Sequence, residues 1–201
     1  MSTVPSGIAA DQSPEGTKAR APRADAQRNL DALVAAAREV FARSGVDAPV
    51  REIAEQAGVG VGTLYRHFPQ RADLVVAVFR SAVDAAADAA PGLLAQYPPG
   101  EAVAQWMQRF VDFIGTKRGL VAALHSGDPA FSTLPAYFRD RFHPALKGLL
   151  DAAIAAGEMR PGIEPTELLT AAANLAHADI AQGRRMVALL VDGLRHGAGR
   201  D

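Results

Sequence analysis

Residues 50–68, VREIAEQAGVGVGTLYRHF, constrain the fold of this chain more than any other stretch. Residues 50–57 place isoleucine and alanine at helical spacing, which predicts a short amphipathic helix. Gly58 follows at once, where a helix end favours a residue that accepts a positive φ. Residues 61–67 then show a second helical pattern. The stretch therefore predicts two short helices joined by a tight turn.

The second of these helices is predicted to bury Leu64 and to leave several polar side chains on or near its exposed side. These side chains belong to Thr63, Tyr65, Arg66 and His67. Such a face suits contact with phosphates and base edges in the major groove of DNA. The alternative is a small helical bundle whose exposed face has no role in DNA binding.

This stretch and its flanks resemble the helix-turn-helix of the TetR family of transcriptional regulators. The resemblance rests on Phe41 and Gly45 of the preceding helix, Ile53-Ala54, Ala57-Gly58-Val59, residues 62–68 and Leu74. It implies an all-α fold, in which a three-helix head is joined by a fourth helix to a C-terminal bundle for ligand binding and dimerisation. Residues around Lys117-Arg118-Gly119-Leu120 and 190–195 resemble, more weakly, a C-terminal domain of an actinobacterial branch of that family.

The candidate DNA contacts are nine residues in and around the turn: Arg51, Gly60, Val61, Gly62, Thr63, Tyr65, Arg66, His67 and Arg71. Val61 and Thr63 suit a thymine methyl group, and Arg66 suits guanine or a phosphate. Tyr65 and His67 are assigned to phosphates by the resemblance. Two positions depart from the family pattern, because Val50 and Gly60 stand where a hydroxyl residue is common. Gly60 still serves as an N-cap, with its neighbouring N–H groups free for a phosphate.

The domain boundaries follow from composition and periodicity. Residues 1–25 lack an apolar period and predict a disordered arm. Residues 26–80 form the predicted DNA-binding domain, with a first helix over 27–44. Residues 81–196 form the predicted ligand-binding and dimerisation domain, and residues 197–201 a tail. The basic residues near the end of the arm suit either a minor-groove contact or a solvated tail: Lys18, Arg20 and Arg23.

The fourth helix is predicted to run from residue 69 to about Pro91-Gly92. The body helices that follow are predicted over 101–115, from 117 to about 125, and over 133–156, 165–181 and 183–195. The last two, about 165–195, carry apolar faces that look wider than one core needs. We therefore expect a homodimer through a four-helix interface; the alternative is that these helices complete the core of the monomer.

A ligand pocket for an unknown small-molecule effector is the other expected site in the body. Its candidate residues are Trp106, Met107, Phe110, Phe113, His125, Tyr137, Phe138 and His177, and Asp128 and Asn174 are further candidate polar points. Aromatic residues at helical spacing also suit a plain core, so spacing alone leaves both interpretations open.

The remaining features exclude several other classes. The chain has no cysteine, its five histidines show no metal-binding spacing, and no nucleophile or phosphate-loop motif occurs. No apolar run suits a membrane span. We therefore expect a cytoplasmic DNA-binding regulator without cofactor or enzymatic activity, whose partners are a double-stranded palindromic operator and an effector that releases it. An all-helical small-molecule-binding protein or enzyme without a DNA role is the alternative, and an activator is a further one.

Overall fold

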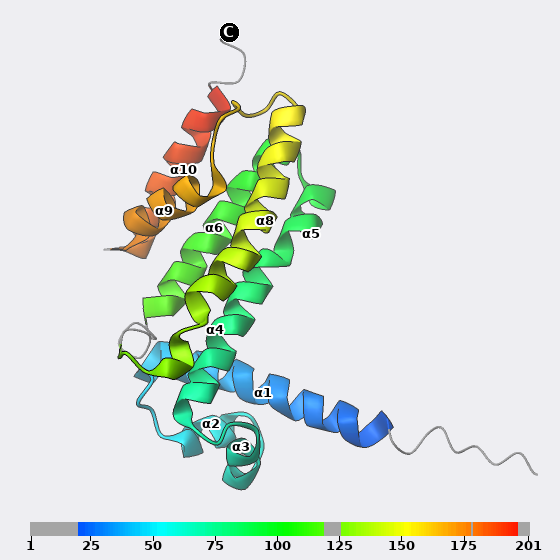
Figure 1. Ribbon diagram of the computed structural model, residues 1–201, viewed down its shortest axis with the longest axis vertical. Coiled ribbons are helices and arrows are strands. Elements are labelled where there is room, and N and C mark those ends of the chain that lie inside the picture. Colours follow the sequence, from blue (N-terminus) through cyan, green and yellow to red (C-terminus); the bar gives the residue numbers. More distant parts are fainter. Residues whose placement is uncertain (1–19, 119–125, 178, 197–201) are drawn as a thin grey trace, which may run out of the picture.

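The computed structural model describes residues 20–118, 126–177 and 179–196, which are helices and connecting turns without a β-strand (Figure 1). This confirms the predicted all-α fold. The elements are α1 (Arg20–Ser44), α2 (Val50–Gln56), α3 (Val61–His67), α4 (Arg71–Ala87), α5 (Ala89–Gln96), α6 (Pro99–Arg118), the 3-10 helix η1 (Pro129–Phe131), α8 (Leu134–Ala155), α9 (Pro165–Ala176) and α10 (Ile180–His196). None of these helices is long and apolar enough to span a lipid bilayer.

The helices α1, α2 and α3 form a small head at one end of the molecule (Figure 1). Helix α1 packs against α2 and α4, and α2 packs against α3. Their contact is made by side chains that are almost completely buried, including Phe41, Ile53 and Leu64. Burying such large apolar groups supplies most of the free energy that holds short helices together.

The body is arranged around α6, which packs against α4, α5, α8, α9 and α10. Trp106 of α6 is fully buried, and its indole N–H donates a hydrogen bond of 2.8 Å to the carbonyl of Ala86 in α4. Helix α4 begins in the head and runs along α8 in the body (Figure 1). It therefore connects the head to the packing of the body.

The first helix is longer than predicted, because α1 begins at Arg20 rather than at residue 27. The predicted disordered arm, residues 1–25, therefore extends too far, because residues 20–25 are helical. Residues 1–19 lie outside the described part of the chain. These residues lack an apolar period, yet Ala, Arg and Gln have good intrinsic helix propensity. The pairs Arg28–Asp25 and Gln27–Asp31 add local support at helical spacing.

Several other helix boundaries differ from the prediction. The fourth helix ends at Ala87, and α5 starts at Ala89. Pro91 lies in the first turn of α5, where a missing N–H has no intrahelical partner to lose. Lys117 and Arg118 end α6 instead of starting a new helix, and the predicted segment up to residue 125 lies outside the described residues. Helix α9 starts at Pro165 as predicted but ends at Ala176, before the predicted residue 181, and α10 starts at Ile180, before the predicted residue 183.

Candidate functional site

The turn between α2 and α3 has the geometry that its glycines predict. Gly58 has a φ of +67°, and its N–H donates to the carbonyl of Glu55 at 3.1 Å. The N–H of Val59 reaches back to the carbonyl of Ala54 at 3.0 Å. Gly60 is the N-cap of α3, and its carbonyl accepts from Thr63 at 2.9 Å. The turn is therefore fixed by backbone hydrogen bonds, without a side-chain cap.

Helix α3 buries one face and exposes the other as predicted. Leu64 is buried, whereas Tyr65 is 50% exposed and lies beside the exposed Arg66. Val61, Thr63 and His67 are half-buried. Their contact with DNA remains a prediction. It requires the major groove to reach the half-buried side chains at the edge of α3 as well as its fully exposed side chains.

The two candidate arginines outside α3 lie in different environments. The side chain of Arg51 is 81% exposed and pairs with Glu55 at 2.8 Å on the same helix. Such an exposed ion pair contributes little, so Arg51 can leave Glu55 for another partner. Arg71 instead donates hydrogen bonds to the carbonyls of Val46 and Ala48, the second at 2.8 Å. Its guanidinium therefore holds the α1–α2 connection, a role that the sequence analysis did not assign to it.

Four of the proposed pocket residues lie in the aromatic core of the body. Trp106, Met107 and Phe110 have no exposed surface, and Phe113 is 5% exposed. Their rings pack against Phe142, with centroids 5.6 Å from Trp106, 5.4 Å from Phe110 and 5.1 Å from Phe113. In this structure they close the core, and none of them lines the cavity described next.

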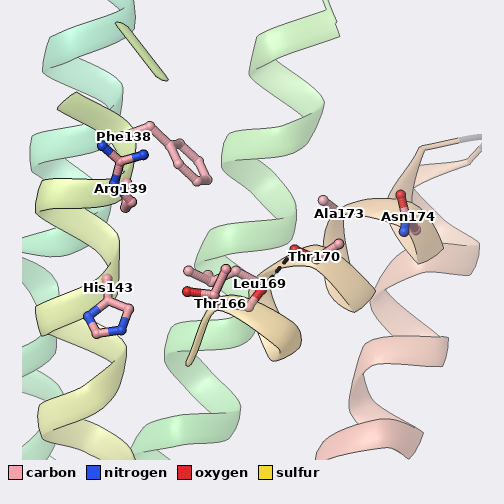
Figure 2. A pocket seen from close by; sticks show the side chains of 8 residues that line it. All are labelled: Phe138, Arg139, His143, Thr166, Leu169, Thr170, Ala173 and Asn174. Carbon is pink, nitrogen blue, oxygen red and sulfur yellow. Dashed lines mark hydrogen bonds between the residues drawn. The ribbon is translucent and has the colours of Figure 1, made fainter. Parts of the chain in front are cut away.

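A cavity of about 270 Å³ lies between α8 and α9 (Figure 2). Its lining is Phe138, Arg139, His143, Thr166, Leu169, Thr170, Ala173 and Asn174. Of these, Phe138 and Asn174 were assigned to a pocket from sequence. The residues from α9 recur at intervals of three and four, so they share one helical face. The mixed polar and apolar stripe on that face is a signal in the sequence that could have indicated the site.

The three other predicted pocket residues lie away from this cavity or outside the described residues. Tyr137 points to α4, where its hydroxyl donates to the carboxylate of Asp84 at 2.7 Å. His177 is exposed at the C-cap of α9. His125 lies outside the described part of the chain.

Tyr137 belongs to a polar network between α4 and α8 that the sequence analysis missed. Arg141 donates to Asp84 at 2.7 Å and to Asp88 at 2.6 Å, and the guanidinium of Arg80 lies 4.9 Å from the centre of the Tyr137 ring. Burial and the hydrogen bond to Asp84 raise the pKa of Tyr137. Hydrogen bonds to Asp84 and Asp88 raise the pKa of Arg141. The network therefore joins the helix that carries the head to a helix that lines the cavity.

In residues 20–118, 126–177 and 179–196, no group of three or more histidine, aspartate or glutamate side chains is placed to hold a metal ion.

Residues 33–78 match the family model of bacterial regulatory proteins of the tetR family, and residues 98–196 match the C-terminal domain of SbtR-like transcriptional regulators.

Two solved structures are similar over most of the chain. The TetR transcriptional regulator SCO0520 of Streptomyces coelicolor is 41% identical, with a TM-score of 0.69, over 82% of this chain and 97% of that one. A TetR transcription regulatory protein of Mycobacterium vanbaalenii is 36% identical, with a TM-score of 0.68, over 87% and 99%. An HTH-type transcriptional regulator of Staphylococcus aureus (strain N315) is 36% identical over 63 residues, which are 31% of this chain and 34% of that relative.

Proposed function

We propose that this chain, which belongs to the TetR family of transcriptional regulators, acts in the cytoplasm as a homodimeric repressor that a small-molecule effector releases from its operator. The observation that carries the proposal is α3, which buries Leu64 against the head and presents the half-exposed Tyr65 beside Arg66. Membership of this family places the chain among DNA-binding regulators and not among enzymes.

Binding to DNA is proposed to use the exposed surface of α3 together with Arg51 at the start of α2. The base-reading groups are few, and each good base contact supplies about 1–3 kcal/mol of discrimination. Two heads that read two half-sites would provide the specificity that one head lacks. This is why the proposal includes a palindromic operator and a dimer.

The proposed dimer interface lies on α9 and α10. Helix α10 buries Val187 and Val191 against the body, yet it leaves Leu189 63% exposed. Leu175 of α9 is also 39% exposed. The two helices cross closely at Gly183, where a Cβ atom would come within 2.5 Å of the Cα of Ala176. Exposed leucines on two tightly paired helices support a four-helix contact with a second copy of the chain.

The effector is proposed to bind in the cavity between α8 and α9. Its wall on α9 ends at Asn174, next to Leu175 of the proposed interface, and its wall on α8 begins at Phe138, next to Tyr137 of the network with α4. A molecule bound there would act on both the dimer contact and the helix that carries the head. It would lower operator affinity only by as much as it prefers the released state.

The test is fluorescence anisotropy of the full-length protein with labelled DNA from upstream of its own gene, over a series of salt concentrations. We expect tight binding that weakens steeply with salt, because basic groups displace counterions from phosphates. Tyr65→Ala should weaken binding by about tenfold or more. Tyr97→Ala is the matched control, since Tyr97 is 40% exposed at the end of α5 in the body.

Equal affinity of Tyr65→Ala and the unaltered protein would contradict the assignment of α3. Absence of any preference over scrambled DNA calls for selection of binding sites from genomic fragments, and failure there would favour a small-molecule-binding protein without a DNA role. A promoter–reporter assay with and without the protein then gives the sign of regulation, since a repressor lowers the reporter signal and an activator raises it.

A further inference from the structure

The described lining of the cavity between α8 and α9 combines an apolar wall with a cationic side chain and several polar ones. Its apolar surface comes from Phe138, Leu169 and Ala173. Its polar side chains are Arg139 and His143 from α8, and Thr166, Thr170 and Asn174 from α9, and the lining contains no aspartate or glutamate. Among the described lining residues, the formal charge is therefore that of the Arg139 guanidinium.

The polar groups have little to bind within the protein. Among the described residues, Arg139 pairs with Asp140 at 3.8 Å, and both side chains are about two-thirds exposed, so this pair is weak. Thr170 donates its hydroxyl to the carbonyl of Thr166 at 2.7 Å (Figure 2). Among the described residues, the side chains of His143, Thr166 and Asn174 have no hydrogen-bond partner. The cavity thus offers hydrogen-bond donors beside an apolar wall.

We propose that this cavity binds a small amphipathic carboxylate with a ring-sized apolar body, an inference that rests on the proposed function and specifies its effector. The apolar body would lie against Phe138, Leu169 and Ala173. The carboxylate would accept hydrogen bonds from Arg139, whose planar fork matches its two oxygens. The volume of about 270 Å³ is below the usual range of about 300–1,000 Å³ for drug-sized ligands, which favours an acid of one or two rings.

The chain carries its own reporter for this cavity. The centroid of the Phe138 ring lies 4.7 Å from that of Phe142, which in turn lies 5.6 Å from that of Trp106. Trp106 is the only tryptophan of the protein. A ligand that reorients Phe138 is therefore expected to change tryptophan fluorescence through two ring contacts, without a label.

The test compares two probes of nearly equal shape, 4-isopropylbenzoate and the neutral 4-isopropylbenzamide, by titration calorimetry and tryptophan fluorescence on the full-length protein. We expect the acid to bind about tenfold more tightly than the amide, as suits a charge-assisted hydrogen bond at a partly exposed site. Arg139→Gln should remove this difference, with a much larger loss of affinity for the acid than for the amide. Ala173→Leu should weaken both probes, because its added side chain fills the apolar part of the cavity.

Lys147→Gln is the matched control, because Lys147 lies on the same helix as an exposed cation that pairs with Asp151 and does not line the cavity. It should alter neither probe. Equal binding of acid and amide, or an acid affinity that Arg139→Gln leaves unchanged, would overturn the proposal, as would no binding of the acid to folded protein at millimolar concentration.

The proposed function is tested separately by the anisotropy assay, so the two failures are distinguishable. Operator binding without affinity for the acid would refute the ligand class and leave the regulator intact. Affinity for the acid that depends on Arg139, without any operator binding, would support the cavity assignment and refute the regulatory role. Release of the operator by the acid, but not by the amide, would support both.

Discussion

Replacing Tyr137 with phenylalanine removes one hydroxyl from the network between α4 and α8. That hydroxyl lies 2.7 Å from both carboxylate oxygens of Asp84. A hydrogen bond to a charged group contributes about 1.5–3 kcal/mol when buried. Because the Asp84 side chain is 38% exposed, solvent competes for it, and we expect a loss of about 1 kcal/mol in the free energy of unfolding.

The assay is thermal and urea unfolding of Tyr137→Phe beside Tyr97→Phe, in which an exposed tyrosine outside the network loses the same atom. A loss of about 1 kcal/mol corresponds to a fall in Tm of roughly 2–4 °C for a chain of this size. Tyr97→Phe should leave Tm unchanged. Equal Tm values for both variants would refute the view that the hydroxyl stabilises the α4–α8 contact.

A double-mutant cycle with Arg141→Gln tests whether these groups act as a network. Arg141 binds the same carboxylate as Tyr137, at 2.7 Å, and also Asp88. Removing either group changes the surroundings of the other, so the two losses should not add, with a coupling of at least about 0.5 kcal/mol. Additive losses would show that the two contacts stabilise the helices independently.

The pKa of Tyr137 gives this prediction a pH dependence. Burial and the Asp84 hydrogen bond raise that pKa above the ordinary tyrosine value of 10.0, so the folded state holds the phenolic proton more tightly than the unfolded state. The contribution is then complete below pH 10.0 and is lost as the pH rises through the raised value. The advantage of the unaltered protein over Tyr137→Phe should therefore be constant from pH 7 to 9 and shrink above 10.0; a constant advantage in alkali would contradict the cause given.

Three further predictions concern the head and the proposed interface. Gly58→Ala should destabilise the head by about 1–2 kcal/mol, because Gly58 has a φ of +67°. Gly62→Ala adds a methyl group with no atom within 4 Å of it, so it should keep Tm but weaken operator binding. Equal Tm values for the two variants would contradict this. Arg71→Ala should lower Tm because it removes the hydrogen bonds to the carbonyls of Val46 and Ala48. It should also lower operator affinity without changing how that affinity depends on salt concentration. A weaker dependence of operator affinity on salt would instead show a direct phosphate contact. Leu189→Glu should convert the dimer to a monomer in sedimentation analysis with its helical circular dichroism retained, and a persistent dimer would locate the interface elsewhere.

The head was predictable from sequence because its determinants are local. Gly58 adopts the positive φ that its position after α2 requires, and Leu64 and Phe68 are buried at the spacing that one helical face dictates. Each of these features depends on neighbours a few residues away. The start of α1 was missed for the opposite reason, because residues 20–26 form a helix with no apolar period to reveal it.

The α4–α8 network was not predictable because it joins residues that are far apart in the chain. Asp84 and Tyr137 are separated by 53 positions, and neither carries a local pattern that indicates a partner. An aspartate on an alanine-rich helix is usually a solvated residue, and a tyrosine among phenylalanines is usually core. Only the packing of α4 against α8 brings the two together.

The cavity shows what apolar spacing can and cannot distinguish. Phe110 and Phe138 occur in similar apolar patterns, yet Phe110 is fully buried in the core and Phe138 lines a cavity. The apolar spacing of one helix does not show whether the side chains of the facing helix fill the space beside it. Helix α9 carries a more informative pattern. It buries Leu168 and Ala172 as an ordinary surface helix does, and its exposed Thr166 and Asn174 line the cavity, but it also leaves Leu175 39% exposed. An exposed leucine favours a surface that covers it, so α9 contributes both to the proposed effector cavity and to the proposed dimer interface.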